Sequence, residues 1–179
     1  MKIFEKLRID KRNLKIIEQG DWIFVPLEFR NKYDLNIQTF SSLVSGGLVE
    51  ATELEGNAEV NKIIVNNKSD DYLVLHDGEI IVGAKQNRTI DKSIILNSNE
   101  IQNVDVLCVE KGRWNYNSSE FSQHNTKLSP EIRYSKESTN QQNKQDVVWN
   151  EIDDIYLNSD QYSQSSDFCE FKEENNEVF

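Results

Sequence analysis

Six short β-type runs follow one another between Leu48 and Val109, and they constrain the fold of this 179-residue chain more than any other feature. The runs span residues 48–53, 60–66, 72–76, 79–82, 89–96 and 104–109. The segments between them are rich in Asn, Asp, Gly and Ser, which favour turns. We expect the runs to build a predominantly antiparallel sheet, in which Asp77-Gly78 closes a hairpin through a type I′ turn.

Weaker patterns lie on either side of these runs. Residues 13–29 contain two apolar stretches around Gln19-Gly20-Asp21, which is typical of a second hairpin. A short helix is expected near 39–46, and apolar residues recur at helical spacing over about 146–157, which predicts an amphipathic helix. Together these patterns predict an α+β fold with an antiparallel β-sheet core over about residues 13–110.

Composition changes after Trp114, where Asn, Ser, Gln and Glu dominate. The run from Ser135 to Gln145 has no apolar anchor, so we expect a long loop before the last helix. The length of the chain fits one domain. We expect that domain to span residues 1–157 and an acidic, weakly ordered tail to span residues 158–179.

Charge and cysteine content narrow the classes of function. The formal net charge is −11, and residues 150–179 hold nine acidic residues against one lysine, which leaves −3 for the rest. Because no basic stripe is present, nucleic acid is not an expected partner. Cys108 and Cys169 lack the spacing of a disulfide framework or a zinc site. With no secretory leader pattern and no long apolar stretch, we expect a cytoplasmic protein without a membrane partner.

A polar cluster, Lys85-Gln86-Asn87-Arg88, follows the β-type run at 79–82 and the small residues Gly83-Ala84. Its side chains combine cations with amide donors and acceptors, a mixture that recognises a phosphate together with a base or sugar edge. The small residues would let a ligand approach the backbone. A polar surface loop is the alternative, but the flanking runs would hold this segment rigid, as a binding site requires.

A second cluster, residues 110–114, follows the last β-type run. Arg113 suits bidentate phosphate binding, Trp114 suits stacking on a base, and Glu110 suits a ribose hydroxyl or acid–base chemistry. Alternatively, Trp114 caps the core while Glu110 and Arg113 form a surface ion pair worth at most about 1 kcal/mol. The predicted ligand-binding residues are Lys85, Gln86, Asn87, Arg88, Glu110, Arg113 and Trp114.

Candidate catalytic groups are few. Glu79 and Glu110 are the carboxylates that could serve a hydrolase as acid and base. His76 and His124 have no partner at metal-ligand spacing, so neither a metal site nor a cofactor is predicted. Cys108 lies inside a β-type run without an adjacent histidine, which indicates a buried and unreactive thiol.

The two clusters, in this order and at this separation, resemble the ARG and rhodanese-phosphatase-superfamily-associated protein (ARPP) domain, a family of bacteria and phages. The resemblance runs from about Phe40 to Trp114 and continues more weakly toward Leu157. Its most specific pieces are Gly83-Ala84-Lys85-Gln86-Asn87-Arg88 and Cys108-Val109-Glu110-Lys111-Gly112-Arg113-Trp114. The resemblance also implies that relatives continue past this point, so we expect a shortened form or a homodimer that completes the site.

The family name records an association with ADP-ribosyl-glycohydrolases, which implies a role for NAD-derived nucleotides, in conflicts between bacteria and phages. We therefore expect a pocket that binds a nucleotide or an ADP-ribose-like molecule for sequestration or sensing. The expected contacts are Lys85, Arg88 and Arg113 to a diphosphate, Trp114 to adenine, and Gln86, Asn87 and Glu110 to ribose hydroxyls or a base edge. A hydrolase using Glu79 and Glu110 and a protein-interaction module remain the alternatives.

Overall fold

The computed structural model describes residues 17–20, 22–24, 36–54 and 61–172, and the chain divides into two units, residues 1–35 and 36–179. In the first unit, β1 (Ile17–Gln19) and β2 (Trp22–Phe24) pair antiparallel, with Gly20 at a φ of +58° in the connection. The hairpin predicted for this part of the chain is confirmed.

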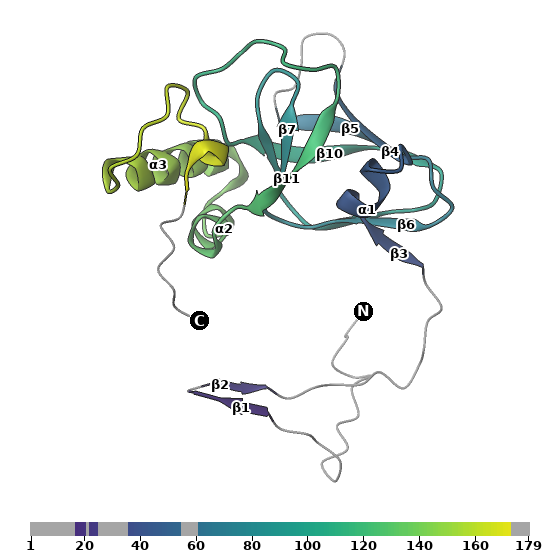
Figure 1. Cartoon of the computed structure of the whole chain (residues 1–179), viewed down its shortest axis with the longest axis horizontal. Helices are drawn as coiled ribbons and strands as arrows, with labels where there is room; N and C mark the ends of the chain where they lie inside the picture. Colours follow the sequence, from purple (N-terminus) through teal and green to yellow (C-terminus); the bar gives the residue numbers. More distant parts are fainter. Residues whose placement is uncertain (1–16, 21, 25–35, 55–60, 173–179) are drawn as a thin grey trace. The chain divides into compact units, whose positions relative to one another are not determined.

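The second unit is built on a six-stranded antiparallel sheet (Figure 1). Its strands, in spatial order, are β11 (Phe121–Lys127), β7 (Glu79–Gly83), β8 (Arg88–Ile90), β10 (Glu100–Cys108), β5 (Lys62–Asn67) and β4 (Val49–Glu53). An isolated bridge between Thr52 and Glu120 joins the edge strand β4 to the residue just before β11. The sheet therefore curls into a half-barrel, and this bridge marks the seam where its two edges meet.

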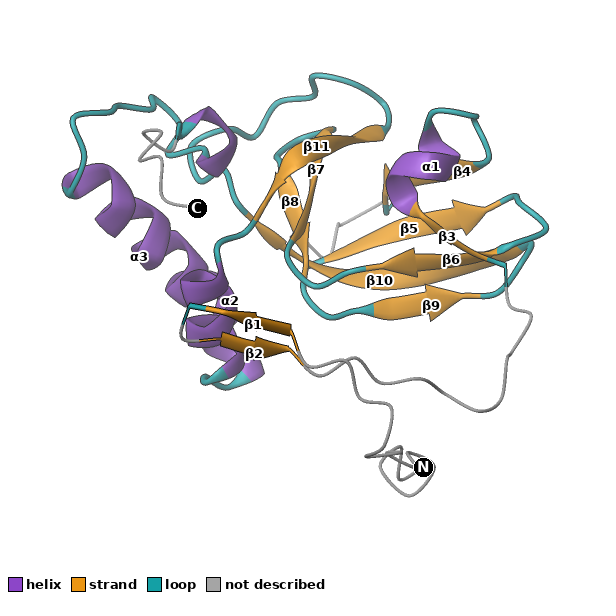
Figure 2. Cartoon of the chain, turned by 60° about the horizontal axis from the view of Figure 1, so that its bottom comes forward, coloured by secondary structure: helices purple, strands orange, loops and turns teal. Residues whose placement is uncertain are grey.

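A smaller, three-stranded sheet lies beside it (Figure 2). β3 (Ile37–Thr39) runs parallel to β6 (Tyr72–Leu75), which pairs antiparallel with β9 (Ile94–Leu96). The predicted short helix follows β3 directly as α1 (Phe40–Val44), and Thr39 and Ser42 form its capping box. The α+β class with a predominantly antiparallel core is confirmed.

Two apolar cores lie on the two faces of the large sheet. Strands β7 and β10 contribute to both: Ile81 and Val106 face the core that includes α1, while Ile80 and Leu107 face the helices. These helices are α2 (Pro130–Glu137) and α3 (Lys144–Leu157), the latter confirming the predicted amphipathic helix. Burial on both faces explains why the middle of β7 and the end of β10 have consecutive apolar residues.

The Asp77-Gly78 turn is present, but the hairpin predicted there is wrong. β6 pairs with β3 and β9, whereas β7 pairs with β8 and β11, so the turn carries the chain from one sheet to the other. Gly78 has a φ of +79° and Asp77 does not have positive φ, while Glu79 N donates to His76 O at 3.1 Å. This is the pattern of a type II turn, whose geometry splays the flanking strands instead of pairing them.

The predicted run at 89–96 is broken at Asp91, because the side chain of Asp91 turns inward to two lysines and β8 and β9 enter different sheets. The long loop predicted after Trp114 is also wrong. It contains β11, α2 and the 3-10 helix η2 (Gln141–Asn143). β11 is an edge strand with a polar sequence, so it gives no strong apolar pattern. α2 is anchored by only one apolar residue, Ile132, and by a buried lysine, so it gives no strong apolar pattern either.

Residues 158–172 belong to the second unit and pack against it. Phe168, in the 3-10 helix η3 (Phe168–Glu170), is only 5% exposed. Its backbone N donates to Val109 O at 2.9 Å, and Gly112 N donates to Ser165 O at 2.8 Å. One aromatic anchor and backbone hydrogen bonds thus order a segment that its acidic composition predicted to be a tail. Among the helices of the described residues, none has the length and apolarity to cross a bilayer.

Candidate functional site

Residues 84–87 connect β7, which ends at Gly83, to its antiparallel neighbour β8. Gly83 and Ala84 both have positive φ, +126° and +44°. A Cβ on Gly83 would lie 2.5 Å from Ser118 Oγ and 2.6 Å from Glu120 O, so glycine is required where these chains approach. The backbone at the start of the polar cluster is therefore fixed in one conformation.

The second cluster lies against this connection, as the sequence predicted. β8 pairs with β10 and places Arg88 opposite Cys108, so the loop that precedes one strand meets the loop that follows the other. Arg113 joins the two loops through six hydrogen bonds and one ion pair. Its Nε donates to both Glu110 oxygens at 2.7 and 2.8 Å, and its Nη atoms donate to Ala84 O at 2.8 Å, Asn115 O at 2.9 Å, Gly83 O at 3.4 Å and Asn87 Oδ1 at 3.1 Å; Glu110 Oε2 also lies 2.7 Å from Nη2.

The amides of the first cluster point inward and find partners within the protein. Gln86 Nε2 donates to Glu110 O at 2.8 Å, and Asn87 N donates to Glu110 Oε2 at 3.1 Å. Asn87 Nδ2 donates to Asp167 Oδ2 at 2.9 Å, which brings in a residue of the C-terminal segment. Burial raises the pKa of Asp167, and the nearby Glu110 raises it further. No signal in the sequence identified Asp167, because its partner lies 80 positions away.

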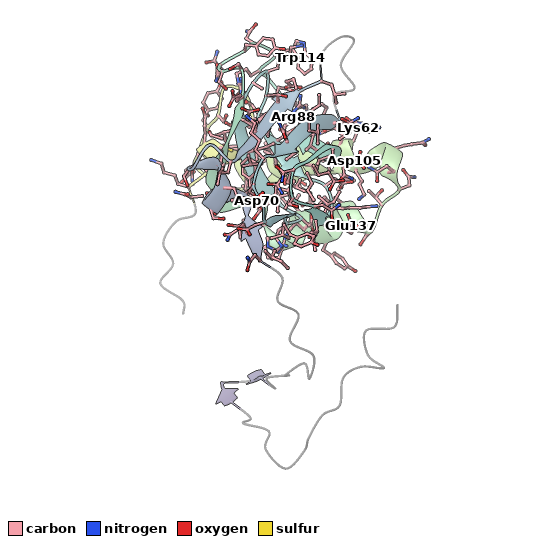
Figure 3. All side chains as sticks on the ribbon, turned by 90° about the vertical axis from the view of Figure 1, so that its right-hand side faces the viewer. Lys62, Asp70, Arg88, Asp105, Trp114 and Glu137 are labelled. Carbon is pink, nitrogen blue, oxygen red and sulfur yellow. The ribbon has the colours of Figure 1, made fainter. Side chains whose placement is uncertain are left out.

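Arg88 is fully buried beneath the two loops. It donates to Gln86 Oε1 at 3.3 Å, to Glu53 Oε1 at 3.4 Å and to Cys108 Sγ. Burial raises the pKa of Cys108, which confirms the predicted buried thiol. In Figure 3, Arg88 lies inside the unit whereas Trp114 lies at its outer end.

Lys85, Trp114 and Tyr116 form what we call the aromatic rim. The Lys85 Nζ lies 5.3 Å from the centroid of the Trp114 ring and 5.1 Å from that of Tyr116. Trp114 is 50% exposed and Tyr116 is 62% exposed, so both rings are accessible, and Lys85 between them is half-buried. A cation held between two aromatic faces can exchange this contact for a ligand anion while the rings stack on a base.

A hollow of about 660 Å³ adjoins the rim at the seam of the sheet. It is lined by Thr52, Glu53, Ile64, Tyr116, Asn117, Ser118 and Ser119. Its volume falls within the roughly 300–1,000 Å³ of small-molecule sites. Apart from Tyr116, which lies two residues after Trp114, these residues carry no sequence signal, because they come together only when the sheet curls.

The two predicted catalytic carboxylates lie at opposite ends of β7. Glu79 begins the strand and accepts from His76 N at 3.1 Å, whereas Glu110 contacts the residues beyond Gly83 at the other end. Four residue-to-residue steps separate the two ends of the strand, roughly 13 Å. Within the described ranges, no group of three or more His, Cys, Asp or Glu side chains could hold a metal ion.

The fold is that of an α+β protein with a hollow of small-molecule size at the seam of a curled antiparallel sheet. The chain belongs to the ARG and Rhodanese-Phosphatase-superfamily-associated Protein domain family, ARPP-1, whose sequence model matches residues 14–178. The match extends past Leu157 and includes the docked segment that supplies Asp167. No curated protein and no solved structure matches this chain.

Proposed function

We propose that this chain binds a nucleotide or an NAD- or ADP-ribose-derived small molecule at the hollow and the aromatic rim, and that it sequesters or senses this ligand. The observation that supports the proposal best is the position of Lys85, whose ammonium group lies between two exposed rings beside the hollow. An ammonium group binds phosphate as a point charge, and an aromatic face stacks on a base. Holding such a signal molecule fits the bacterial and phage conflict that the family resemblance implies.

The buried residues of the two clusters act as support in this proposal. Arg113, Asn87 and Glu110 use their hydrogen-bonding groups on one another and on the Gly83 and Ala84 carbonyls. This network fixes the backbone from which Lys85 projects. A side chain on a rigid backbone binds at a lower entropic cost than one on a flexible loop.

Hydrolysis of the ligand is the weaker candidate. Glu79 and Glu110 are not together, and both oxygens of Glu110 accept hydrogen bonds from Arg113. The two cysteines are poor nucleophiles, because burial raises the pKa of Cys108 and, with a smaller contribution from Asp167, that of Cys169. The described residues thus favour binding over turnover.

A ligand-release assay tests the proposal. Purified protein is melted with ADP-ribose, NAD, cyclic ADP-ribose isomers and cyclic dinucleotides, and any ligand that raises the melting temperature is then released by heat and analysed by chromatography. Recovery of the intact ligand supports sequestration, whereas a new product supports the hydrolase.

Trp114→Ala should abolish the thermal shift because it removes one face of the rim. Tyr134→Ala is the matched control, since Tyr134 is an aromatic residue that is 77% exposed on α2, away from the hollow. If Trp114→Ala keeps the full shift, or if no ligand shifts the wild type, the proposed site is wrong.

A further inference from the structure

Glu53 is the carboxylate among the described residues that line the hollow. It is the last residue of β4 and only 8% exposed, yet it lines the hollow. Its Oε1 accepts from Arg88 Nη2 and from Lys85 N, both at 3.4 Å. Its Oε2 accepts no hydrogen bond from any described residue. A largely buried acceptor with spare capacity is a place where a ligand donor gains free energy.

Arg88 restricts the orientation of the Glu53 carboxylate through its ion pair with Oε1. The guanidinium is fully buried and is itself held by Gln86 Oε1 and Cys108 Sγ, so it cannot follow Glu53 if the side chain moves. The ion pair between Arg88 and Glu53 occupies Oε1, while Glu53 also lines the hollow. Such a preorganised acceptor discriminates between ligands by the donors that they carry.

The rest of the lining favours an uncharged, hydroxyl-bearing group. Ser118 Oγ already accepts from Ala84 N at 3.0 Å and donates to Glu120 O at 2.6 Å. The remaining walls offer the side chains of Thr52, Asn117 and Ser119, together with Ile64 and one face of Tyr116. A phosphate inside the hollow would lie beside a carboxylate and be repelled, so the phosphate belongs outside it, at Lys85.

We propose that the hollow binds a ribose through its free 2′ and 3′ hydroxyls, with Glu53 accepting from this diol while Lys85 binds the adjoining phosphate. This inference rests on the nucleotide-binding function proposed above, and it narrows the ligand to ribonucleotides and their sugar phosphates. A carboxylate has the acceptor capacity for two adjacent hydroxyl donors, and acidic side chains recognise ribose hydroxyls in this way in other nucleotide sites.

The direct test uses matched ligand pairs on the wild-type chain. Dissociation constants are measured calorimetrically for ADP and 2′-deoxy-ADP, and by displacement of ADP-ribose for ribose 5-phosphate and 2-deoxyribose 5-phosphate. We expect at least one ribose ligand to bind about tenfold tighter than its deoxy partner, the loss expected when a hydrogen bond to a charged acceptor is removed. Equal affinity within both pairs overturns the ribose assignment and leaves the nucleotide-binding function standing. If neither the ADP compounds nor ADP-ribose bind, the ribose assignment is overturned, and the nucleotide-binding function is then decided by the other ligands of the melt.

Glu53→Gln then tests whether Glu53 is the group that accepts from the ribose hydroxyls. We expect the ratio between ribose and deoxyribose ligands to fall to near one, mainly because the ribose ligand binds more weakly. The ratio of the two dissociation constants within one variant does not depend on how much of the protein is folded. If this variant does not fold at all, the ligand pairs measured on the wild type still decide whether the hollow binds a ribose. Glu50→Gln, on the same strand and paired with Lys68, is the control that should keep the ratio. A ratio that persists in Glu53→Gln overturns the assignment to Glu53.

Discussion

Two groups of charged side chains in this protein differ in how completely their charges are paired. The first, which we call the Asp91 cluster, comprises Asp91, Lys136, Lys144 and Glu137. Lys136 and Lys144 Nζ lie 3.3 and 3.0 Å from Asp91 Oδ1, and both also contact Glu137 Oε1. The second group is the aromatic rim, where Lys85 contacts two aromatic rings and, among the described residues, no carboxylate.

Burial explains the difference. The side chain of Lys136 is fully buried; burial favours a lower pKa, but hydrogen bonds to Asp77 and Glu137 outweigh it and raise the pKa of Lys136. For Asp91, burial acts to raise the pKa, yet Gln141 and the two lysines lower it. Fully paired charges of this kind hold β8, α2 and α3 together. Lys85 stays half-buried at the rim and keeps its charge available, which is what a binding group requires.

The largest effect should follow from breaking the Asp91 cluster. Asp91→Ala removes the buried one of the two carboxylates that both lysines contact and should lower the free energy of unfolding by about 3–5 kcal/mol, measured by urea denaturation. Asp160→Asn, at an exposed position, should change it by less than about 0.5 kcal/mol. A loss from Asp91→Ala no larger than that of the control would contradict the view that this cluster holds the fold.

A substitution of Arg88 tests whether this residue of the polar cluster supports the fold, in contrast to Lys85, which is proposed to bind ligand. Arg88→Met removes the donors to Glu53, Gln86 and Cys108 and should cost about 1–3 kcal/mol, less than Asp91→Ala because Glu53 borders the hollow and can be hydrated. The measurement is again urea denaturation, at neutral pH. An unchanged stability would mean that Arg88 is free for ligand and is not a support of the loop.

Strand positions could be predicted from the sequence, but their pairing could not. Alternation and turn residues are local signals, and they placed β4, β5, β6 and β7 correctly. Whether a turn closes a hairpin or changes sheets depends on which distant strands compete for pairing. For this reason Asp77-Gly78 was placed correctly as a turn and wrongly as a hairpin.

The site shows the same limit. That the two loops lie together could be predicted, because two β-type runs each end in polar residues. That Asn87 and Arg88 point inward could not be predicted, because their partners Asp167 and Glu53 lie 80 and 35 positions away in the sequence. The four polar residues alone do not reveal that one of them, Lys85, projects outward while the other three are buried.

A smaller effect is expected at the edge of the Asp91 cluster, where Glu137 is 47% exposed. Hydrogen bonds from Lys144 and Lys136 lower the pKa of Glu137 from 4.5 to about 2. The pKa of Glu137 is lower in the folded state than in the unfolded state. Its ion pairs therefore stabilise the fold fully above about pH 4.5, and this stabilisation is lost as the pH falls toward 2. Solvent screening limits it to about 1 kcal/mol or less.

Urea denaturation of Glu137→Gln and the wild type between pH 2 and 6 checks this prediction. The two curves should be separated above about pH 4.5 and converge near pH 2. Glu131→Gln, on the first turn of the same helix, controls for the change in net charge. Curves that stay parallel would show that the two lysines do not depend on Glu137.

The smallest effect on stability, about 0.5 kcal/mol, should come from Lys85→Ala, since an exposed cation–π contact is worth little. Its effect on ligand binding should nevertheless be as large as that of Trp114→Ala, because the ammonium is the phosphate-binding group. Lys85→Arg should restore much of the affinity, and the exposed Lys92→Ala should leave both quantities unchanged. Calorimetric titration with ADP-ribose, alongside a urea melt, measures the two together. If Lys85→Ala lost stability as Asp91→Ala does while keeping its ligand affinity, the distinction between paired charges that support the fold and accessible ones that bind would not hold.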